Sequence, residues 1–108
     1  MLNQTVLVGR LVSDPTICES KEGKKESVIT LAVPRNFKNK QGEYETDFID
    51  CTLYNGIAEN TVEYCKKGDM VGVKGRIQWI EGESLKIIAE KLTFLTSKHK
   101  EDWFFFWG

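Results

Sequence analysis

The sequence contains few of the residues from which catalytic and metal-binding sites are usually built. Among its 108 residues there is one histidine, His99, and the three cysteines form no C-x-x-C pair. Catalytic triads and zinc sites depend on histidine or on clustered thiols. The carboxylates show no paired spacing, and no P-loop pattern that could cradle a phosphate is present. The sequence therefore predicts a protein that is not an enzyme and that has no metal site and no cofactor.

A disulfide pattern, a membrane span and an export signal are also missing. Cys18, Cys51 and Cys65 are an odd number of thiols, and we expect them to be reduced and structural. No apolar run is long enough to cross a bilayer, and Met1–Gln4 has no charged region or cleavage site. These absences favour a cytoplasmic location and no membrane partner.

Charge of one sign does not dominate. The chain has 15 Lys and Arg residues against 16 Asp and Glu residues, a formal net charge of -1. This balance argues against a protein that holds nucleic acid by bulk positive charge. Local basic tracks remain possible, because binding depends on where the charges lie.

What the sequence does contain is a series of strand patterns within one domain. We expect strands over residues 4–12, 27–34, 46–54, 70–80 and 84–89, the last continuing through 92–96. A helix is expected between strands three and four, with Asn55 as its N-cap and Gly68 at C′. Pro34 should end pairing in its strand, and Asn36–Glu45 should form a polar loop.

This order of elements is that of the OB-fold, an all-β, five-stranded Greek-key barrel with one short helix. An SH3-like barrel has similar strands but usually no helix at this point. We expect the barrel domain over residues 1–97 and a short C-terminal tail over 98–108. The first strand has apolar residues in both phases, with Leu7 and Leu11 in one and Val6 and Val8 in the other. Such a strand is buried on both faces, which predicts that another subunit covers the second face.

The third strand places aromatic rings on its polar face. Ile49, Cys51 and Leu53 share one phase, whereas Phe48 and Tyr54 lie in the opposite phase. Rings outside a core are typical of a surface that binds flat, apolar ligands, of which nucleic-acid bases are the commonest.

Cations accompany these rings. The expected loop contains Arg35, Phe37, Lys38 and Lys40, and Lys74 and Arg76 lie opposite the apolar phase of strand four. Aromatic platforms flanked by cations favour single-stranded over duplex binding, because a duplex exposes no base faces.

Each of these features also has a purely structural explanation. Phe37 could pack against its own domain, and Tyr54 could cap the core. Lys74 and Arg76 could be a solvated strand face, while Trp79 shares the apolar phase of its strand and fits core or hairpin packing at least as well as a base platform.

Several ordered motifs together are similar to a known family. They are Met1–Leu11 followed by Asp14-Pro15, Ile29–Val33 followed by Arg35-Asn36-Phe37, Asp47–Cys51, Ala58–Asn60, Tyr64–Gly68 and Val71–Arg76. Over about Met1 to Leu95 the chain resembles the bacterial-type single-stranded DNA-binding proteins (SSB).

The resemblance implies an OB-fold homotetramer, with a dimer as the alternative, that wraps single-stranded DNA without sequence preference. It would protect exposed strands in replication, recombination and repair, close to the nucleoid. Phe37, Phe48 and Tyr54 match the family's stacking aromatics, and the same alignment implies phosphate contacts from Arg10, Arg35, Lys67 and Lys74. The rival hypothesis is an oligomeric OB-fold adaptor, as in primosomes, that acts mainly through protein contacts. An OB-fold nuclease would need clustered carboxylates and a metal.

The C-terminal tail departs from the family pattern. Relatives usually end in a flexible linker and an acidic tip that recruits replication and repair proteins. Here Glu101-Asp102 precedes five aromatic residues between Trp103 and Trp107. The alternatives are a truncated end or a segment packed on a neighbouring subunit, a substitute docking peptide for such partner proteins, and rings that occupy the chain's own base-binding groove.

Overall fold

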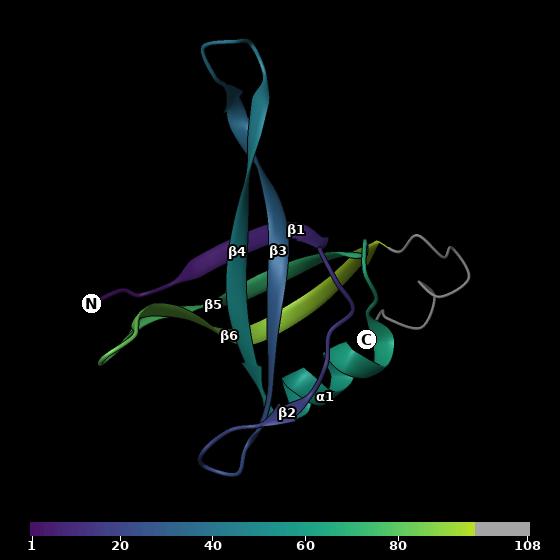
Figure 1. The fold of residues 1–108 in the computed structure, drawn as a ribbon, viewed down its shortest axis with the longest axis vertical. Coiled ribbons are helices and arrows are strands. Elements are labelled where there is room, and N and C mark those ends of the chain that lie inside the picture. The colour runs from purple at the N-terminus through teal and green to yellow at the C-terminus, as the bar shows by residue number, and fades with distance from the viewer. Residues whose placement is uncertain (97–108) are drawn as a thin grey trace.

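The computed structural model describes residues 1–96, which form six strands and one helix (Figure 1). The tail and His99 lie outside the described residues. The elements are β1 (Thr5–Leu11), β2 (Cys18–Glu19), β3 (Lys25–Lys38), β4 (Tyr44–Tyr54), α1 (Asn55–Tyr64), β5 (Met70–Ile80) and β6 (Ser84–Thr96).

Five of the strands close into a barrel. Their order is β1-β5-β6-β4-β3, and the pairs Arg10↔Ala32 and Leu11↔Leu31 join β1 back to β3. The short β2 pairs only with the start of β3. The β4–β6 pairing is parallel, and the others are antiparallel. This arrangement confirms the predicted five-stranded barrel with a single helix between its third and fourth strands.

The core is built from the inward phase of the strands. Leu31, Cys51, Leu53, Val71 and Val73 are almost completely buried. The helix α1 covers one side of this core with Ala58 and Thr61, and Cys65 follows it. Cys51 and Cys65 are buried, Cys18 is exposed, and all three thiols are free. Burial, followed by a nearby carboxylate, raises the pKa of the Cys51 and Cys65 thiols to about 11, so both are protonated at neutral pH.

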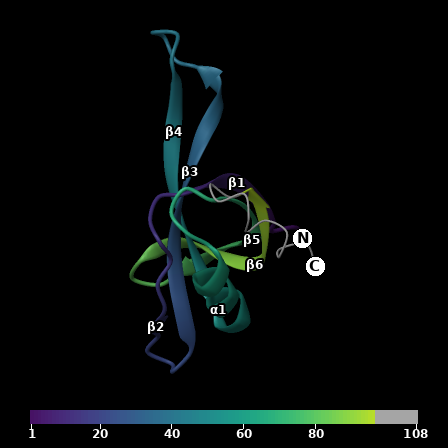
Figure 2. The ribbon, with the colours of Figure 1, turned by 90° about the vertical axis from the view of Figure 1, so that its right-hand side faces the viewer.

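The strands β3 and β4 are longer than the sequence pattern predicts. The ladder includes the pair Pro34↔Thr46, is interrupted by a change of register, and resumes at Lys38↔Tyr44. Between the pairs Pro34↔Thr46 and Lys38↔Tyr44, β3 has residues 35–37 whereas β4 has only Glu45. Proline has no backbone N–H to donate to the ladder and is tolerated beside such a bulge. The two strands can therefore pair again beyond it. The result is a two-stranded arm, residues 34–46, that projects from the barrel in both views (Figures 1 and 2).

Both predicted helix caps were wrong. The N-cap is Tyr54, which is extended and makes no side-chain capping bond, and Asn55 is already the first helical residue. The helix ends earlier than expected, with Cys65 as its C-cap. Gly68 instead has a φ of 91° in the following turn and donates its N–H to the carbonyl oxygen of Leu11 at 2.8 Å. Gly68 therefore belongs to a turn that contacts β1 and does not end the helix. None of the helices in the described part of the chain is long and apolar enough to cross a membrane.

Two glycines allow the barrel strands to approach closely. A Cβ atom at Gly9 would lie 2.6 Å from the carbonyl oxygen of Ala32, next to the point where β1 returns to β3. A Cβ atom at Gly75 would collide with the backbone carbonyl of Ile88, beside the irregularity in the β5–β6 ladder. Backbone atoms cannot move aside as a flexible side chain can, so both sites require glycine for steric reasons.

We predict that Gly75→Ala lowers the free energy of unfolding by about 1–3 kcal/mol, because the added methyl group must displace β6 backbone. Urea denaturation monitored by circular dichroism measures the loss. Gly72→Ala is the matched control on the same strand, where the nearest heavy atom is Leu95 Cδ1 at 3.7 Å, an ordinary contact. Equal stability of the two variants would contradict the steric argument.

Candidate nucleic-acid interface

The outer face of β4 displays the predicted aromatic rings. Phe48 is 68% exposed, whereas its inward neighbours on β4, Cys51 and Leu53, are fully buried. Tyr54 is half-buried at the end of the same strand, and Lys24 Nζ lies 5.8 Å from the centre of its ring. A cation over a tyrosine face is a favourable contact that leaves part of the ring accessible. The core does not contain either ring, as the strand's period of two predicts.

A groove continues this face between the β2–β3 turn and the β5–β6 hairpin. Its volume is about 620 Å³, and Tyr54, Arg76, Gln78 and Ile88 are among the residues that line it. In OB-folds, the corresponding face and the two flanking loops bind oligonucleotides. The groove and the exposed ring of Phe48 thus lie along one strand, β4, which makes them parts of one candidate interface.

The electrostatics of the groove are balanced. Its lining contains four cations and four carboxylates, which are Lys21, Lys24, Arg76 and Lys86 with Glu22, Glu26, Glu81 and Glu83. Several are paired: Lys24 Nζ lies 3.7 Å from Glu22, Lys86 Nζ 3.6 Å from Glu83, and Arg76 Nη1 3.3 Å from Glu90. Exposed ion pairs of this kind are weak, so a phosphate can exchange for the carboxylate at little cost.

The arm carries a second group of rings and cations. Phe37 is 61% exposed, which rules out packing of its ring into its own domain. Lys38 and Lys40 are also exposed, and Lys38 Nζ lies 5.8 Å from the centre of the Tyr44 ring. Tyr44 falls in the segment expected to be a polar loop, so the sequence pattern did not single it out. Extending the period of two backwards from Phe48 would have placed it on the outer face.

Arg35 is engaged within the arm. Its Nε and Nη2 donate to both carboxylate oxygens of Asp47 at 3.1 and 2.9 Å, and its Nη1 donates to Glu45 at 2.5 Å. The hydrogen bonds and the charge of Asp47 raise the pKa of Arg35, and the hydrogen bond from Arg35 lowers the pKa of Asp47. This clamp ties β3 to β4 at the bulge. The phosphate contact that the family resemblance implies for Arg35 would have to break or share these bonds.

The remaining predicted cations lie apart from the groove, except Arg76. Arg10 donates to the carbonyl oxygen of Gly68 at 2.9 Å and so holds the turn that follows α1. In that turn the backbone N–H of Lys67 donates to Asp14 Oδ1 at 2.7 Å, and the Lys67 side chain is exposed. Lys74 is exposed on β5, two residues before Arg76 and in the same phase. The structure therefore groups Tyr54 and Arg76 in the groove, places Phe48 farther along β4, and leaves the other predicted cations outside the groove.

Trp79 lies outside the core. It is 67% exposed and pairs across the β5–β6 hairpin with Leu85, which is equally exposed. Ile77, in the same apolar phase, is exposed as well. The hairpin extends past the closed part of the barrel, so its apolar phase has no core to face. This excludes core packing for Trp79.

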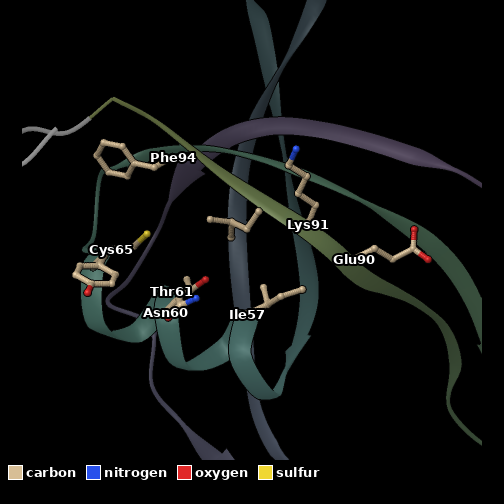
Figure 3. Close-up of a pocket in the computed structure, with 9 residues that line it drawn as sticks. Ile57, Asn60, Thr61, Cys65, Glu90, Lys91 and Phe94 are labelled. Carbon is tan, nitrogen blue, oxygen red and sulfur yellow. The ribbon is translucent and has the colours of Figure 1, made fainter. Parts of the chain in front are cut away.

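A second hollow lies between α1 and β6 (Figure 3). Its volume is about 270 Å³, and Ile57, Cys65, Lys91 and Phe94 are among its lining residues. None of the predicted DNA-contacting residues lines it. Among residues 1–96, no three His, Cys, Asp or Glu side chains are grouped closely enough to hold a metal ion. We therefore assign the candidate interface to the β4 face, the groove and the arm.

Comparisons with known proteins identify the family of the chain. The model of the single-strand binding protein family matches residues 2–95. Single-stranded DNA-binding protein B of Bacillus subtilis (strain 168) is 42% identical over 109 aligned positions, which cover 94% of this chain and 96% of that protein. Single-stranded DNA-binding protein 3 of Listeria innocua serovar 6a is 45% identical, over 91% of this chain and 66% of that protein.

A solved structure shows the same fold. A crystal structure of a deletion mutant of the single-stranded DNA binding protein from Thermus aquaticus superposes with a TM-score of 0.70. The identity is 24%, and the match covers 90% of this chain and 52% of that chain. This likeness supports the OB-fold.

The Arg35 clamp generates a prediction about ionisation. Because Arg35 favours the charged carboxylate, Asp47 should titrate below the ordinary range of an aspartate, and the clamp should open only as the pH falls through that lowered value. In Arg35→Gln the pKa of Asp47 should rise towards the ordinary range of an aspartate. Carbon-detected NMR of the Asp47 carboxyl group measures this, and Arg76→Gln, which removes a distant ion pair, should leave it unchanged. An Asp47 pKa that is the same in the wild type and Arg35→Gln would rule the clamp out.

Proposed function

This chain belongs to the single-strand binding protein family, and we propose that it carries out non-catalytic, largely sequence-independent binding of single-stranded DNA along the β4 face, the groove and the arm. The supporting observation is the 68% exposure of Phe48 on a strand whose opposite phase contributes the fully buried Cys51 and Leu53 to the core. A ring in that position adds nothing to the core, but it offers a flat platform to any base.

The binding mode follows from the chemistry of the interface. Bases stack on Phe37, Phe48 and Tyr54, and every base has a face that can do so. Lys38, Lys40, Lys67, Lys74, Arg10 and Arg76 are the cations proposed to contact phosphates, with Arg35 joining them where its clamp opens. Neither kind of contact reads a base edge, so affinity should depend weakly on sequence. Such a protein covers and protects exposed strands during replication, recombination and repair in the cytoplasm. Family membership supports this function over that of a primosome-like adaptor.

We predict that Phe48→Ala weakens binding to oligonucleotides of every base composition by about 1–3 kcal/mol, with little change in salt dependence. Lys74→Ala is the contrasting variant, because it removes a charge and keeps the rings. It should reduce the slope of log K against log salt by about 1. Fluorescence or anisotropy titrations with oligo-dT, oligo-dC and oligo-dA at several salt concentrations measure both quantities. Equal affinity of Phe48→Ala and the wild type for all three would argue against base stacking on this face.

We also propose that the protein is a homo-oligomer, most simply a tetramer, built through β1. Val6 is 66% exposed and Val8 is exposed beside it on the outer face of the strand. The edge of β1 turned away from β5 pairs with β3 only at Arg10 and Leu11, so within residues 1–96 the stretch Thr5–Gly9 has a free edge. Free edges and apolar faces of this kind are usually covered by another chain.

Light scattering tests the assembly directly. We expect a molar mass several times the 12.4 kDa of one chain, and Val6→Lys should reduce it because it places a charge in the covered face. Val28→Lys, at an exposed valine on the outer face of β3, is the matched control and should leave the mass unchanged. A wild-type mass of a single chain at micromolar concentration would contradict the proposal.

A further inference from the structure

Tyr44 is a large ring that the fold itself does not use. It is 60% exposed near the end of the arm, outside the hydrophobic core. The contact found for its ring is with Lys38, its cross-strand partner, whose Nζ lies 5.8 Å from the ring centre. Pairing across a strand fixes both side chains on the same face of the arm. The arm therefore presents an aromatic ring and a cation as one unit.

Tyr44 is aligned with the rings of the β4 face. Tyr44, Phe48 and Tyr54 occupy even positions of one strand, and the extra residues at the bulge belong to β3, so the alternation along β4 is not interrupted. All three rings thus lie in the same phase of the strand, and the twist of β4 turns this phase gradually between the groove and the arm. At about 3.3 Å per residue, Tyr44 lies roughly 13 Å from Phe48, and Phe48 lies roughly 20 Å from Tyr54. The three rings form a row from the groove to the end of the arm.

The arm is held in place against the barrel. Arg35 joins Asp47 and Glu45 midway between Phe48 and Tyr44, on the opposite phase of β4. A bidentate guanidinium–carboxylate pair restricts both strands, so the row of rings keeps its direction beyond the closed part of the barrel. A ring on a preorganised strand costs less to order on binding than one in a free loop.

We propose that Tyr44 is a further base-stacking residue, and that Lys38 beside it contacts the phosphate of the same nucleotide. The proposal rests on the proposed function and extends it: the arm lengthens the DNA footprint beyond Phe48. A strand that occupies only the groove and Phe48 does not reach Tyr44, whereas a longer strand does. The contribution of Tyr44 must therefore depend on oligonucleotide length.

The test compares oligo-dT at the short and long ends of the range for an OB-fold, about 4 and about 16 nucleotides. Tyr44→Ala should lose about tenfold in affinity for the longer oligomer and less than about twofold for the shorter one, within the range measured for single stacking contacts. Tyr44→Phe keeps the ring and should bind both oligomers like the wild type. Lys38→Gln should lower the salt slope for the longer oligomer only.

Phe48→Ala separates the failure of this proposal from the failure of the proposed function. If Phe48→Ala binds oligo-dT weakly and Tyr44→Ala binds both lengths like the wild type, Tyr44 is not a stacking residue although the β4 face is. If the wild type itself does not bind oligo-dT, the proposed function is wrong, and this proposal with it. A lower molar mass of Tyr44→Ala would assign the ring to a subunit contact and overturn the proposal.

A second measurement does not depend on a variant. Irradiation of the wild-type complex with an oligo-dT that contains iodinated uracil should crosslink Tyr44, and mass spectrometry of the peptides locates the site. Crosslinks confined to the Phe48 and Tyr54 peptides with the longer oligomer would overturn the proposal.

Discussion

Closure of the barrel is the constraint on which the other features depend. Because β1 returns to β3, the inward residues of five strands form a complete core from Leu31, Leu53, Val71 and their neighbours. The core then needs nothing from the outward phase of β4. Close backbone approach at Gly9 and Gly75 makes this closure possible. The outward phase is consequently free to carry rings whose exposure would be unfavourable without a ligand.

The candidate interface has cations paired with carboxylates and no large excess of positive charge. Several lysines and arginines of the groove and arm lie next to carboxylates, in pairs such as Lys24–Glu22 and Lys86–Glu83. These exposed pairs contribute little stability, and they keep the net charge of the chain near zero. A strand of DNA that brings its own phosphates can replace the carboxylates, while the rings supply the contacts that are not screened by salt.

The alternation of side chains made the barrel and its outer rings predictable from the sequence. Ile49, Cys51 and Leu53 against Phe48 and Tyr54 indicated which face is buried, and this depends only on the local period of a strand. The arm could not be predicted in the same way. The polar composition of Asn36–Glu45 and the proline at position 34 are typical of a loop, and pairing past them depends on a bulge that only the partner strand determines.

Tertiary contacts explain the other differences. Gly68 has the positive φ of a helix-ending residue, but it belongs to a turn that bonds to Leu11 on β1. Arg35 has the sequence context of a phosphate contact, and its carboxylate partners come from the neighbouring strand ten and twelve residues away. Trp79 follows the apolar phase of β5 beyond the point where the barrel ends. In each case the role of the residue depends on parts of the chain that are distant in sequence, which the local pattern does not contain.

The positions of the two apolar surfaces limit how copies of the chain can associate. The rings of the candidate interface lie in the outward phase of β4, whereas the free edge and exposed valines belong to β1. The strands β5 and β6 lie between them on one side of the barrel, and on the other side β1 reaches β3 only at Arg10 and Leu11. Association through β1 would therefore cover Val6 and Val8 without covering Phe48. Each added copy would then bring its own row of rings, and the arm, which projects away from the barrel, would remain available to a DNA strand that passes from one copy to the next.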